Sequence, residues 1–339
     1  MQTRLAPHIK DTATGKEADA ILRKCVHCGF CTATCPTYQL LGDELDGPRG
    51  RIYLIKQMLE GETVTQTTQL HLDRCLRCRS CETTCPSGVG YGRLADIGRA
   101  MVDEQVRRPP AQRLKRAAIR AVLPHRNRFG PLLAFGRAVR SLLPERWRRL
   151  IPARRPAGAW PAVRHDRKLL TLGGCVQPSV HPGIDAAAAR VLDRLGVSVV
   201  KVPATGCCGA VNYHTGGHRD GLDDMRRNID TWWPLLSGDI EGILVNASAC
   251  ALTVKEYGQA LAHDPDYADK AARISELGRD LSEIIADEEI ARLGRPAPGS
   301  QRIAFHSPCT LQHGQKLNGK VEGILTELGF DLAPVPDAH

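Results

Sequence analysis

The sequence predicts a multidomain chain of class α plus α/β, with a helical domain first and α/β domains after it. Residues 1–106 hold eight of the 13 cysteines, in two runs of identical spacing. Residues 166–295 alternate strand-like and helix-like segments, and residues 296–339 begin that alternation again. Between these regions, residues 107–165 form a linker rich in Arg and Pro. We therefore expect four regions, the last of them a truncated second copy of the third.

Length and composition agree with this division. At about 100–200 residues per domain, 339 residues suit two or three domains. No segment is apolar enough to span a bilayer, and Met1–Thr12 lacks the apolar core of a secretory signal. Cysteines in a cytoplasmic protein stay reduced, so an odd count of 13 favours metal or redox chemistry over disulfides. We expect a cytoplasmic protein.

The first domain contains two complete runs of the form CxxCxxCxxxCP. In two-cluster ferredoxins the first three cysteines of such a run bind one iron-sulfur cube, and the fourth binds the other cluster. Zinc is the alternative, but a tetrahedral site built from two CxxC pairs has no use for a third in-step cysteine. The sequence therefore predicts two [4Fe-4S] clusters with crossed ligands. These are Cys25, Cys28, Cys31 and Cys85 for one cluster, and Cys75, Cys78, Cys81 and Cys35 for the other.

The long connection between the two runs favours a helical ferredoxin-type domain over a compact β-type one. Within it, Arg49–Glu60 has its apolar residues at helical spacing, which predicts a helix with one buried face. That face comprises Ile52, Ile55, Met58 and Leu59.

A second group of cysteines follows the predicted strands of the α/β region. In an open α/β sheet the carboxyl ends of the strands line one crevice, so we expect these thiols to converge. They could bind a further iron-sulfur cluster, act as redox-active thiols, or pack as small apolar side chains. The candidates are Cys175, Cys207, Cys208 and Cys250, with Cys309 as a fifth that opens the second copy.

The repeat is visible in corresponding strings. Lys168–Cys175 and Arg302–Cys309 each read as a strand that ends in a cysteine loop, and each is followed by a helix closed by Gly. The first copy continues into Cys207-Cys208-Gly209, whereas the second stops just before the equivalent position. We expect the natural polypeptide to continue beyond His339.

The net charge of +9 is concentrated in the linker. Residues 107–155 hold fourteen Arg and one Lys against one Glu. An apolar stripe from Leu132 to Ile151 lies opposite Arg side chains, with Pro144 expected to kink it. Basic amphipathic helices of this kind bind anionic membrane surfaces. The same stripe could instead pack on a partner subunit or on the protein's own domains.

Four histidines lie near cysteines and are candidate ligands or proton relays, although a histidine near a loop usually serves as neither. They are His181, His214, His306 and His313. No Walker A sequence occurs, and the glycine-containing string Gly90–Ala95 follows Cys85-Pro86 rather than a strand. We therefore expect no hydride-accepting cofactor on this chain. Because these clusters move single electrons, flavin is expected only on a partner.

The chain resembles the iron-sulfur subunits of glycolate oxidase, also called glycolate dehydrogenase. The resemblance rests on both cysteine runs and on short strings along the whole chain. These strings are Arg49-Gly-Arg-Ile-Tyr53, Gly174-Cys-Val-Gln-Pro178, Gly206-Cys-Cys-Gly-Ala210, Asn228-Ile-Asp-Thr-Trp-Trp233, Val254-Lys-Glu-Tyr-Gly258 and Ser307-Pro-Cys-Thr-Leu-Gln-His313. The later cysteines also resemble the Cys-Cys-Gly domain of the heterodisulfide reductase group, except that Thr253 replaces its last cysteine.

The resemblance implies an electron-transfer subunit without catalytic residues of its own. Electrons from glycolate would pass from FAD-binding partner subunits through the clusters toward a quinone or another acceptor, leaving glyoxylate. An iron-sulfur subunit of a lactate or glycerol-3-phosphate dehydrogenase is the nearest alternative, because the partner sets substrate specificity. The protein could also sit peripherally on the inner face of the cytoplasmic membrane through residues 107–155.

A nucleic-acid-binding protein with structural metal is the alternative from another class. Its support is the pI of about 9.0 and the Arg-rich linker. Proteins that bind single strands usually interleave aromatic residues with the basic ones, and only three aromatics lie between Arg107 and Arg155. We expect no nucleic-acid partner.

Overall fold

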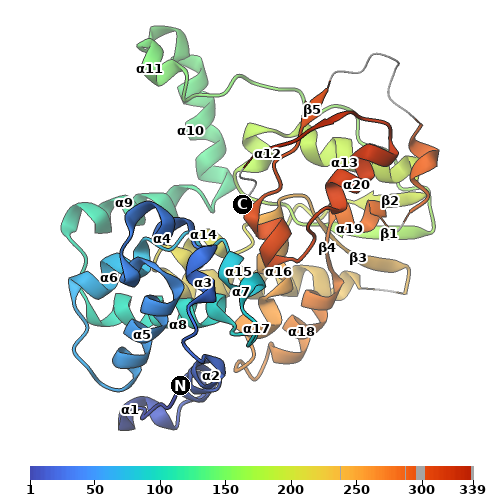
Figure 1. Ribbon diagram of the computed structural model, residues 1–339. Coiled ribbons are helices and arrows are strands. Elements are labelled where there is room, and N and C mark those ends of the chain that lie inside the picture. Colours follow the sequence, from blue (N-terminus) through green and yellow to red (C-terminus); the bar gives the residue numbers. More distant parts are fainter. Residues whose placement is uncertain (237, 287, 295–301, 337–339) are drawn as a thin grey trace. The chain divides into compact units, whose positions relative to one another are not determined.

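The computed structural model describes residues 1–236, 238–286, 288–294 and 302–336. It divides into two compact units, whose elements Figure 1 labels. The first unit comprises Met1–Leu114 and Pro308–Lys316, and the second comprises Lys115–Ser307 and Leu317–Ala338.

This division differs from the predicted one at two places. Most of the Arg-rich linker belongs to the second unit, and a short segment near the C-terminus belongs to the first. The boundary predicted between residues 295 and 296 lies outside the described residues.

The first unit is helical throughout its described residues. Its core lies among α2, α5 and α8, where Leu22, Ile55 and Leu94 are fully buried. Helix α8 approaches α5 closely at Gly98, where a Cβ atom would lie 2.7 Å from Ile55. The elements are α1 (Pro7–Lys10), α2 (Ala13–Lys24), α3 (Phe30–Ala33), α4 (Pro36–Leu41), η1 (Glu44–Asp46), α5 (Pro48–Leu59), α6 (Gln66–Asp73), α7 (Ser80–Thr84), α8 (Tyr91–Gln105) and η5 (Thr310–Gly314), with α9 (Pro110–Val122) crossing into the second unit.

The helix predicted over Arg49–Glu60 is confirmed as α5. The four apolar residues of its predicted face are all buried. Pro48 begins the helix, where its missing N–H costs no hydrogen bond. The helix starts two residues after the end of η1, so Arg49 and Arg51 of the helix lie near the acidic residues of η1.

The second unit contains an open parallel sheet of four strands in the order β2-β1-β3-β4. All three strand pairs are parallel, with Leu169 opposite Val199 and Leu170 opposite Ile243. The strands are β1 (Arg167–Thr171), β2 (Val197–Val200), β3 (Ile240–Val245) and β4 (Gly278–Asp280).

Helices cover both faces of this sheet, as its uninterrupted apolar strands require. On one face Leu169 packs with Leu192 of α13 and Ile284 of α19. On the other, Leu170 packs in the cluster that contains Trp232 of α15 and Ile274 of α18. These helices and their neighbours are α12 (Gln177–Val180), α13 (Gly183–Arg194), α14 (Ala210–His214), α15 (His218–Trp232), η3 (Trp233–Leu235), α16 (Ser248–Lys255), α17 (Tyr257–Ala260), α18 (Ala268–Leu277), α19 (Leu281–Ala286) and η4 (Ile290–Leu293).

A short second strand pair follows in the chain. β5 (Ile303–Ala304) and β6 (Leu332–Ala333) are parallel, and α20 (Lys320–Glu327) connects them. Strand, helix and parallel strand therefore occur in the same order as β1, α13 and β2. This order is compatible with a duplication, which stays a prediction.

The Arg-rich segment forms α9, α10 (Arg126–Ala138), η2 (Arg140–Leu142) and α11 (Glu145–Arg148). Pro144 precedes α11, so the chain breaks at the expected place. In the apolar stripe, Leu142, Trp147 and Leu150 are 83%, 55% and 70% exposed. Other members, such as Leu133, Val139 and Ile151, are partly buried. None of the helices described here has the length and apolar character needed to span a bilayer.

Candidate iron-sulfur centres

The two cysteine runs of the first unit fold in the same way. Each begins just after a helix, enters a loop and then a short helix, and ends at a cysteine beside Pro. In the loops, His27 and Gly29 have φ angles of 59° and 86°, and Arg77 and Arg79 have 57° and 63°. Left-handed backbone is unfavourable for residues other than Gly, and where it occurs it often marks a ligand site. The same two positions of each run adopt it, which turns the loops back around the thiols.

One cavity is lined by the first three cysteines of the first run and the last cysteine of the second. Burial raises the pKa of Cys31 to about 11, and the neighbouring charges of Cys25, Cys28 and Cys85 add to the effect. The cysteines that line this cavity are Cys25, Cys28, Cys31, Cys81 and Cys85.

A second cavity has the complementary set. Burial raises the pKa of Cys78 to about 11, and the charges of Cys309, Cys75 and Cys35 raise it further. Cys81 borders both cavities, and burial raises the pKa of its thiol strongly. The lining cysteines are Cys35, Cys75, Cys78 and Cys81.

Five thiols from both runs thus line the first cavity and four line the second, with Cys81 common to both, and each set contains the four donors that a [4Fe-4S] cluster needs. The raised pKa values mean that Cys31, Cys78 and Cys81 are protonated without metal at neutral pH, so cluster binding must displace protons there. The fourth cysteine of each run lines the cavity of the other run, as crossed ligation requires. The ligand assignment itself stays a prediction.

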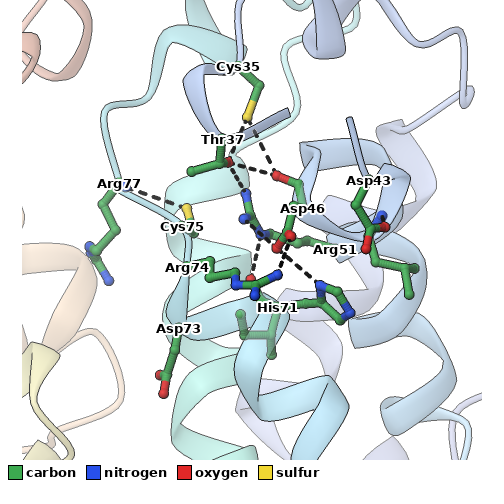
Figure 2. Close-up of polar contacts among 12 residues, drawn as sticks. Cys35, Thr37, Asp43, Asp46, Arg51, His71, Asp73, Arg74, Cys75 and Arg77 are labelled. Atoms are coloured by element: carbon green, nitrogen blue, oxygen red, sulfur yellow. Dashed lines mark hydrogen bonds and ion pairs between the residues drawn. The ribbon is translucent and has the colours of Figure 1, made fainter. Parts of the chain in front are cut away.

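A largely buried ionic cluster lies beside the second cavity (Figure 2). We define this buried ionic cluster as Asp46, Arg51 and His71, which are buried, together with Arg74, whose side chain is 41% exposed. The Asp46 carboxylate accepts from Arg74 Nη1 at 2.7 Å and contacts His71 Nδ1 at 3.0 Å. Arg51 Nη2 is 3.4 Å from Asp46 Oδ1. Burial alone would raise the pKa of Asp46, but its hydrogen bonds with His71 and Arg74 lower it.

Polar atoms of Asp43, Asp46 and His71 lie close enough together to suggest a metal site. Two guanidinium groups already contact the Asp46 carboxylate, and both repel a cation. We therefore assign no metal to this group.

In the second unit, four cysteines meet at the carboxyl ends of the strands. Cys175 follows β1, the Cys207-Cys208 pair follows β2, and Cys250 begins the helix after β3. All four are free cysteines, and hydrogen bonds connect their thiols in a row. These hydrogen bonds join Cys175 to Cys207, Cys207 to Cys208, and Cys208 to Cys250. The hydrogen bond from Cys175 lowers the pKa of Cys207, and that from Cys208 lowers the pKa of Cys250. The donor set fits iron, and the site is the crevice in which open α/β sheets bind ligands.

Backbone and side-chain contacts hold the Cys207-Cys208 pair in place. Asn228 accepts from Gly206 N at 2.9 Å and donates to the Cys207 carbonyl at 2.7 Å. The Tyr257 hydroxyl donates to the Cys208 carbonyl at 2.9 Å. Gly209 has a φ of 95°, and a Cβ atom there would lie 2.7 Å from the Gly221 carbonyl oxygen. The Cys-Cys-Gly string therefore needs its glycine for both conformation and space.

Cys309 directly precedes η5. It belongs to the first unit, and its charge acts on Cys78. The reason is local: the segment forms η5, which packs on α7, and His313 Nδ1 lies 3.2 Å from Thr83 Oγ1. The expectation that Cys309 joins the strand-end thiols stays a prediction.

Thr253 occupies the position of the missing cysteine within α16. Its hydroxyl donates to the Ala249 carbonyl at 2.9 Å, so it is satisfied within its own helix. Among the other candidate residues, His214 packs edge-on against Tyr213, His181 follows α12, and His306 lies between β5 and η5. No ligand role for these histidines emerges from these contacts.

Sequence reasoning missed the residues around the thiols. Arg51, Asn228 and Tyr257 all lie in strings that carry the family resemblance, but nothing in the strings showed what they touch. A charged or amide residue inside an apolar helical pattern was the available signal.

Comparison with known proteins places both cysteine regions in families. The 4Fe-4S dicluster domain family matches residues 21–89, and the cysteine-rich domain family matches residues 170–255. The glycolate oxidase iron-sulfur subunit of Escherichia coli is 55% identical over the whole of this chain and 83% of its own length. The probable glycolate oxidase iron-sulfur subunit of Bacillus subtilis is 26% identical over 86% of this chain and 71% of its own.

A more distant similarity covers half of the chain. Lactate utilization protein A of Geobacillus thermodenitrificans is 25% identical over 49% of this chain and 67% of its own length. No solved structure is significantly similar to the chain.

The crossed ligand sets predict how cysteine variants group. Cys31→Ser and Cys85→Ser should each damage the cluster of the first cavity, whereas Cys35→Ser should damage the one that Cys75→Ser damages. Low-temperature electron paramagnetic resonance (EPR) of the reduced variants distinguishes the two signals. Spectra in which Cys31 and Cys35 affect the same cluster contradict the assignment.

Proposed function

The chain belongs to the family of glycolate oxidase iron-sulfur subunits, and from this premise we propose that it conducts electrons from a flavoprotein partner to an acceptor. The partner oxidises glycolate to glyoxylate on flavin and releases two electrons, which pass one at a time. On this chain, Cys25, Cys28, Cys31 and Cys85 hold one [4Fe-4S] cluster. Cys75, Cys78, Cys81 and Cys35 hold the other.

The observation that carries this proposal is the adjacency of the two thiol-lined cavities. Cys81 and Tyr91 border both, so two clusters bound there are neighbours. A single unit that places two clusters side by side is suited to relay electrons. The chemistry of the hydroxy acid itself belongs to the partner, because a cluster accepts one electron whereas this oxidation releases two.

Lactate is the second candidate substrate of the complex. The similarity to lactate utilization protein A supports it, but the two sequences are only 25% identical, over 49% of this chain. The 55% identity to the glycolate oxidase subunit extends over the whole of it. We therefore propose glycolate.

Anaerobic purification together with the partner subunits tests the function. We expect about eight irons per chain from the first unit, with matching sulfide and with flavin only on the partner. Adding glycolate should reduce flavin first and the clusters afterwards, as followed by absorbance and EPR. Flavin bound to this chain, or clusters that stay oxidised while flavin is reduced, would contradict the proposal.

We further propose that the strand-end thiols form a third redox centre, which is either another iron-sulfur cluster or a redox-active thiol group. The hydrogen-bonded chain of four thiols supports this over packing alone, because packing requires no convergence of sulfurs at a sheet edge.

Cys207→Ser tests the third centre. The variant should slow electron transfer to a quinone acceptor while flavin reduction by glycolate proceeds at the normal rate, because the change lies after the flavin. Stopped-flow absorbance measures both steps. Thr253→Ser, which keeps the hydroxyl hydrogen bond beside the site, serves as the control. Normal acceptor reduction by Cys207→Ser would leave packing as the better account.

We propose that residues 107–155 attach the complex peripherally to an anionic membrane. Apolar side chains stay exposed beside a surplus of Arg, which is the pattern of an interfacial segment. Each basic residue near such a surface contributes about 1 kcal/mol. The acceptor would then be a membrane quinone.

The triple variant Leu142→Ser, Trp147→Ser, Leu150→Ser should lose sedimentation with phosphatidylserine vesicles while keeping its iron, since no cysteine lies in the segment. Salt at 1 M should have a similar effect, because it shortens the screening length to about 3 Å. Leu40→Ser, at a residue 82% exposed in the first unit, is the control. Unchanged vesicle binding with loss of the flavoprotein would make the segment a partner surface instead.

A further inference from the structure

Helix α5 carries two arginines, each beside one of the thiol-lined cavities. Arg49 lines the first cavity, and Arg51 lines the second. Their surroundings differ sharply: the side chain of Arg49 is 36% exposed and that of Arg51 is 1% exposed. Solvent screens the first charge, whereas the second acts through a medium of low dielectric constant.

The charge of Arg51 is only partly neutralised by protein. Arg74 makes the shorter contact with Asp46, at 2.7 Å against 3.4 Å for Arg51. The other bonds of Arg51 go to neutral groups, with Nε donating to the His71 carbonyl at 2.7 Å and Nη1 to Thr37 Oγ1 at 3.1 Å. One carboxylate therefore faces two guanidinium groups, and the buried ionic cluster carries excess positive charge.

Thiolates formed at the second cavity would supply the remaining negative charge. Burial opposes the charged form of Arg51, yet the pKa of Arg51 is raised, by Tyr91, Cys75, Cys35 and Asp46. Burying a charge is costly unless it is paired. The cost is offset when the cysteines beside Arg51 become thiolates around a cluster.

Hydrogen bonds donated to Cys75 Sγ also stabilise negative charge in the second cavity. Cys75 Sγ accepts from the Arg77 N–H at 3.4 Å and from the Tyr91 hydroxyl at 3.6 Å. Cys35 Sγ lies 3.2 Å from Thr37 Oγ1. The Thr37 hydroxyl donates to the Asp46 carbonyl at 2.7 Å and accepts from Arg51 Nη1 at 3.1 Å, so it is not a donor to a thiolate at Cys35. Hydrogen bonds to ligand sulfurs and nearby charge both affect a cluster's reduction potential.

We propose that the positive charge of Arg51 raises the reduction potential of the cluster held by Cys35, Cys75, Cys78 and Cys81. This potential then lies above that of the cluster in the first cavity. The inference rests on the proposed function, because it requires both clusters. Reduction adds one negative charge and no atoms, so a fixed positive charge favours the reduced form. With both clusters bound, the fixed charge of Arg51 would make the cluster of the second cavity the favoured site for the electron.

Potentiometric EPR titration of the holoprotein tests this. Arg51→Gln should lower the equilibrium constant for reduction of the second cluster about tenfold, which is about 59 mV for one electron. The first cluster should keep its midpoint. Arg51→Lys, which keeps the charge, should shift the second cluster less. Lys56→Gln removes a charge from the same helix at a residue that lines neither cavity, so it is the matched control and should shift neither midpoint appreciably.

Tyr91→Phe keeps the inference testable if Arg51→Gln fails to assemble, because it removes only the hydroxyl that donates to Cys75. It should lower the second midpoint in the same direction, by less. Equal midpoints in the unaltered protein, or a second midpoint unmoved by Arg51→Gln, overturn the inference. Where Arg51→Gln fails to assemble, a second midpoint unmoved by Tyr91→Phe overturns it. Loss of one of the two cluster signals from the unaltered protein would instead overturn the proposed function.

Discussion

Thiolate groups that lie close together repel one another, and the first unit is organised around bringing eight cysteines to two places. Without metal, Cys31 and Cys78 stay protonated, because their pKa values are raised to about 11. The backbone must therefore hold the geometry before the metal stabilises it. Left-handed residues at matching positions of both loops accomplish this, and the packed core of α2, α5 and α8 offsets their conformational cost.

The second unit meets the same constraint by different means. Its thiols share protons along a hydrogen-bonded chain instead of surrounding a cavity. The parallel sheet brings three strand ends together, and Asn228 and Tyr257 fix the carbonyls of the cysteine pair. Gly209 lets the chain turn directly into α14, which packs against α15. Convergence here comes from sheet topology, whereas in the first unit it comes from loop conformation.

Much of this was predictable because spacing and periodicity report directly on geometry. The two cysteine runs predicted paired sets of thiols, the apolar period predicted the buried face of α5, and strand-end placement predicted the convergence of Cys207 with Cys175. Cys309 was not predictable in this way, because a strand followed by a cysteine loop says nothing about which unit the loop packs on. The apolar stripe ending at Leu150 was also ambiguous, since a buried face and an interfacial one have the same period.

Arg51 lay beyond sequence reasoning for a more specific reason. The string Arg49-Gly-Arg51 looks like a solvated helix surface, and only contact with η1 distinguishes its two charges. That short turn supplies both carboxylates: Glu44 pairs with Arg49 at 2.6 Å, and Asp46 pairs with Arg51. Gly50 permits the contact, because a Cβ atom there would lie 2.2 Å from the Glu44 carbonyl oxygen. Gly50 thus allows α5 to pack closely against η1. In this arrangement the Arg49 guanidinium reaches solvent, whereas that of Arg51 is buried. The same formal charge then has a weak effect at one cavity and a strong effect at the other, and this difference can give a pair of otherwise similar clusters a direction for electron flow.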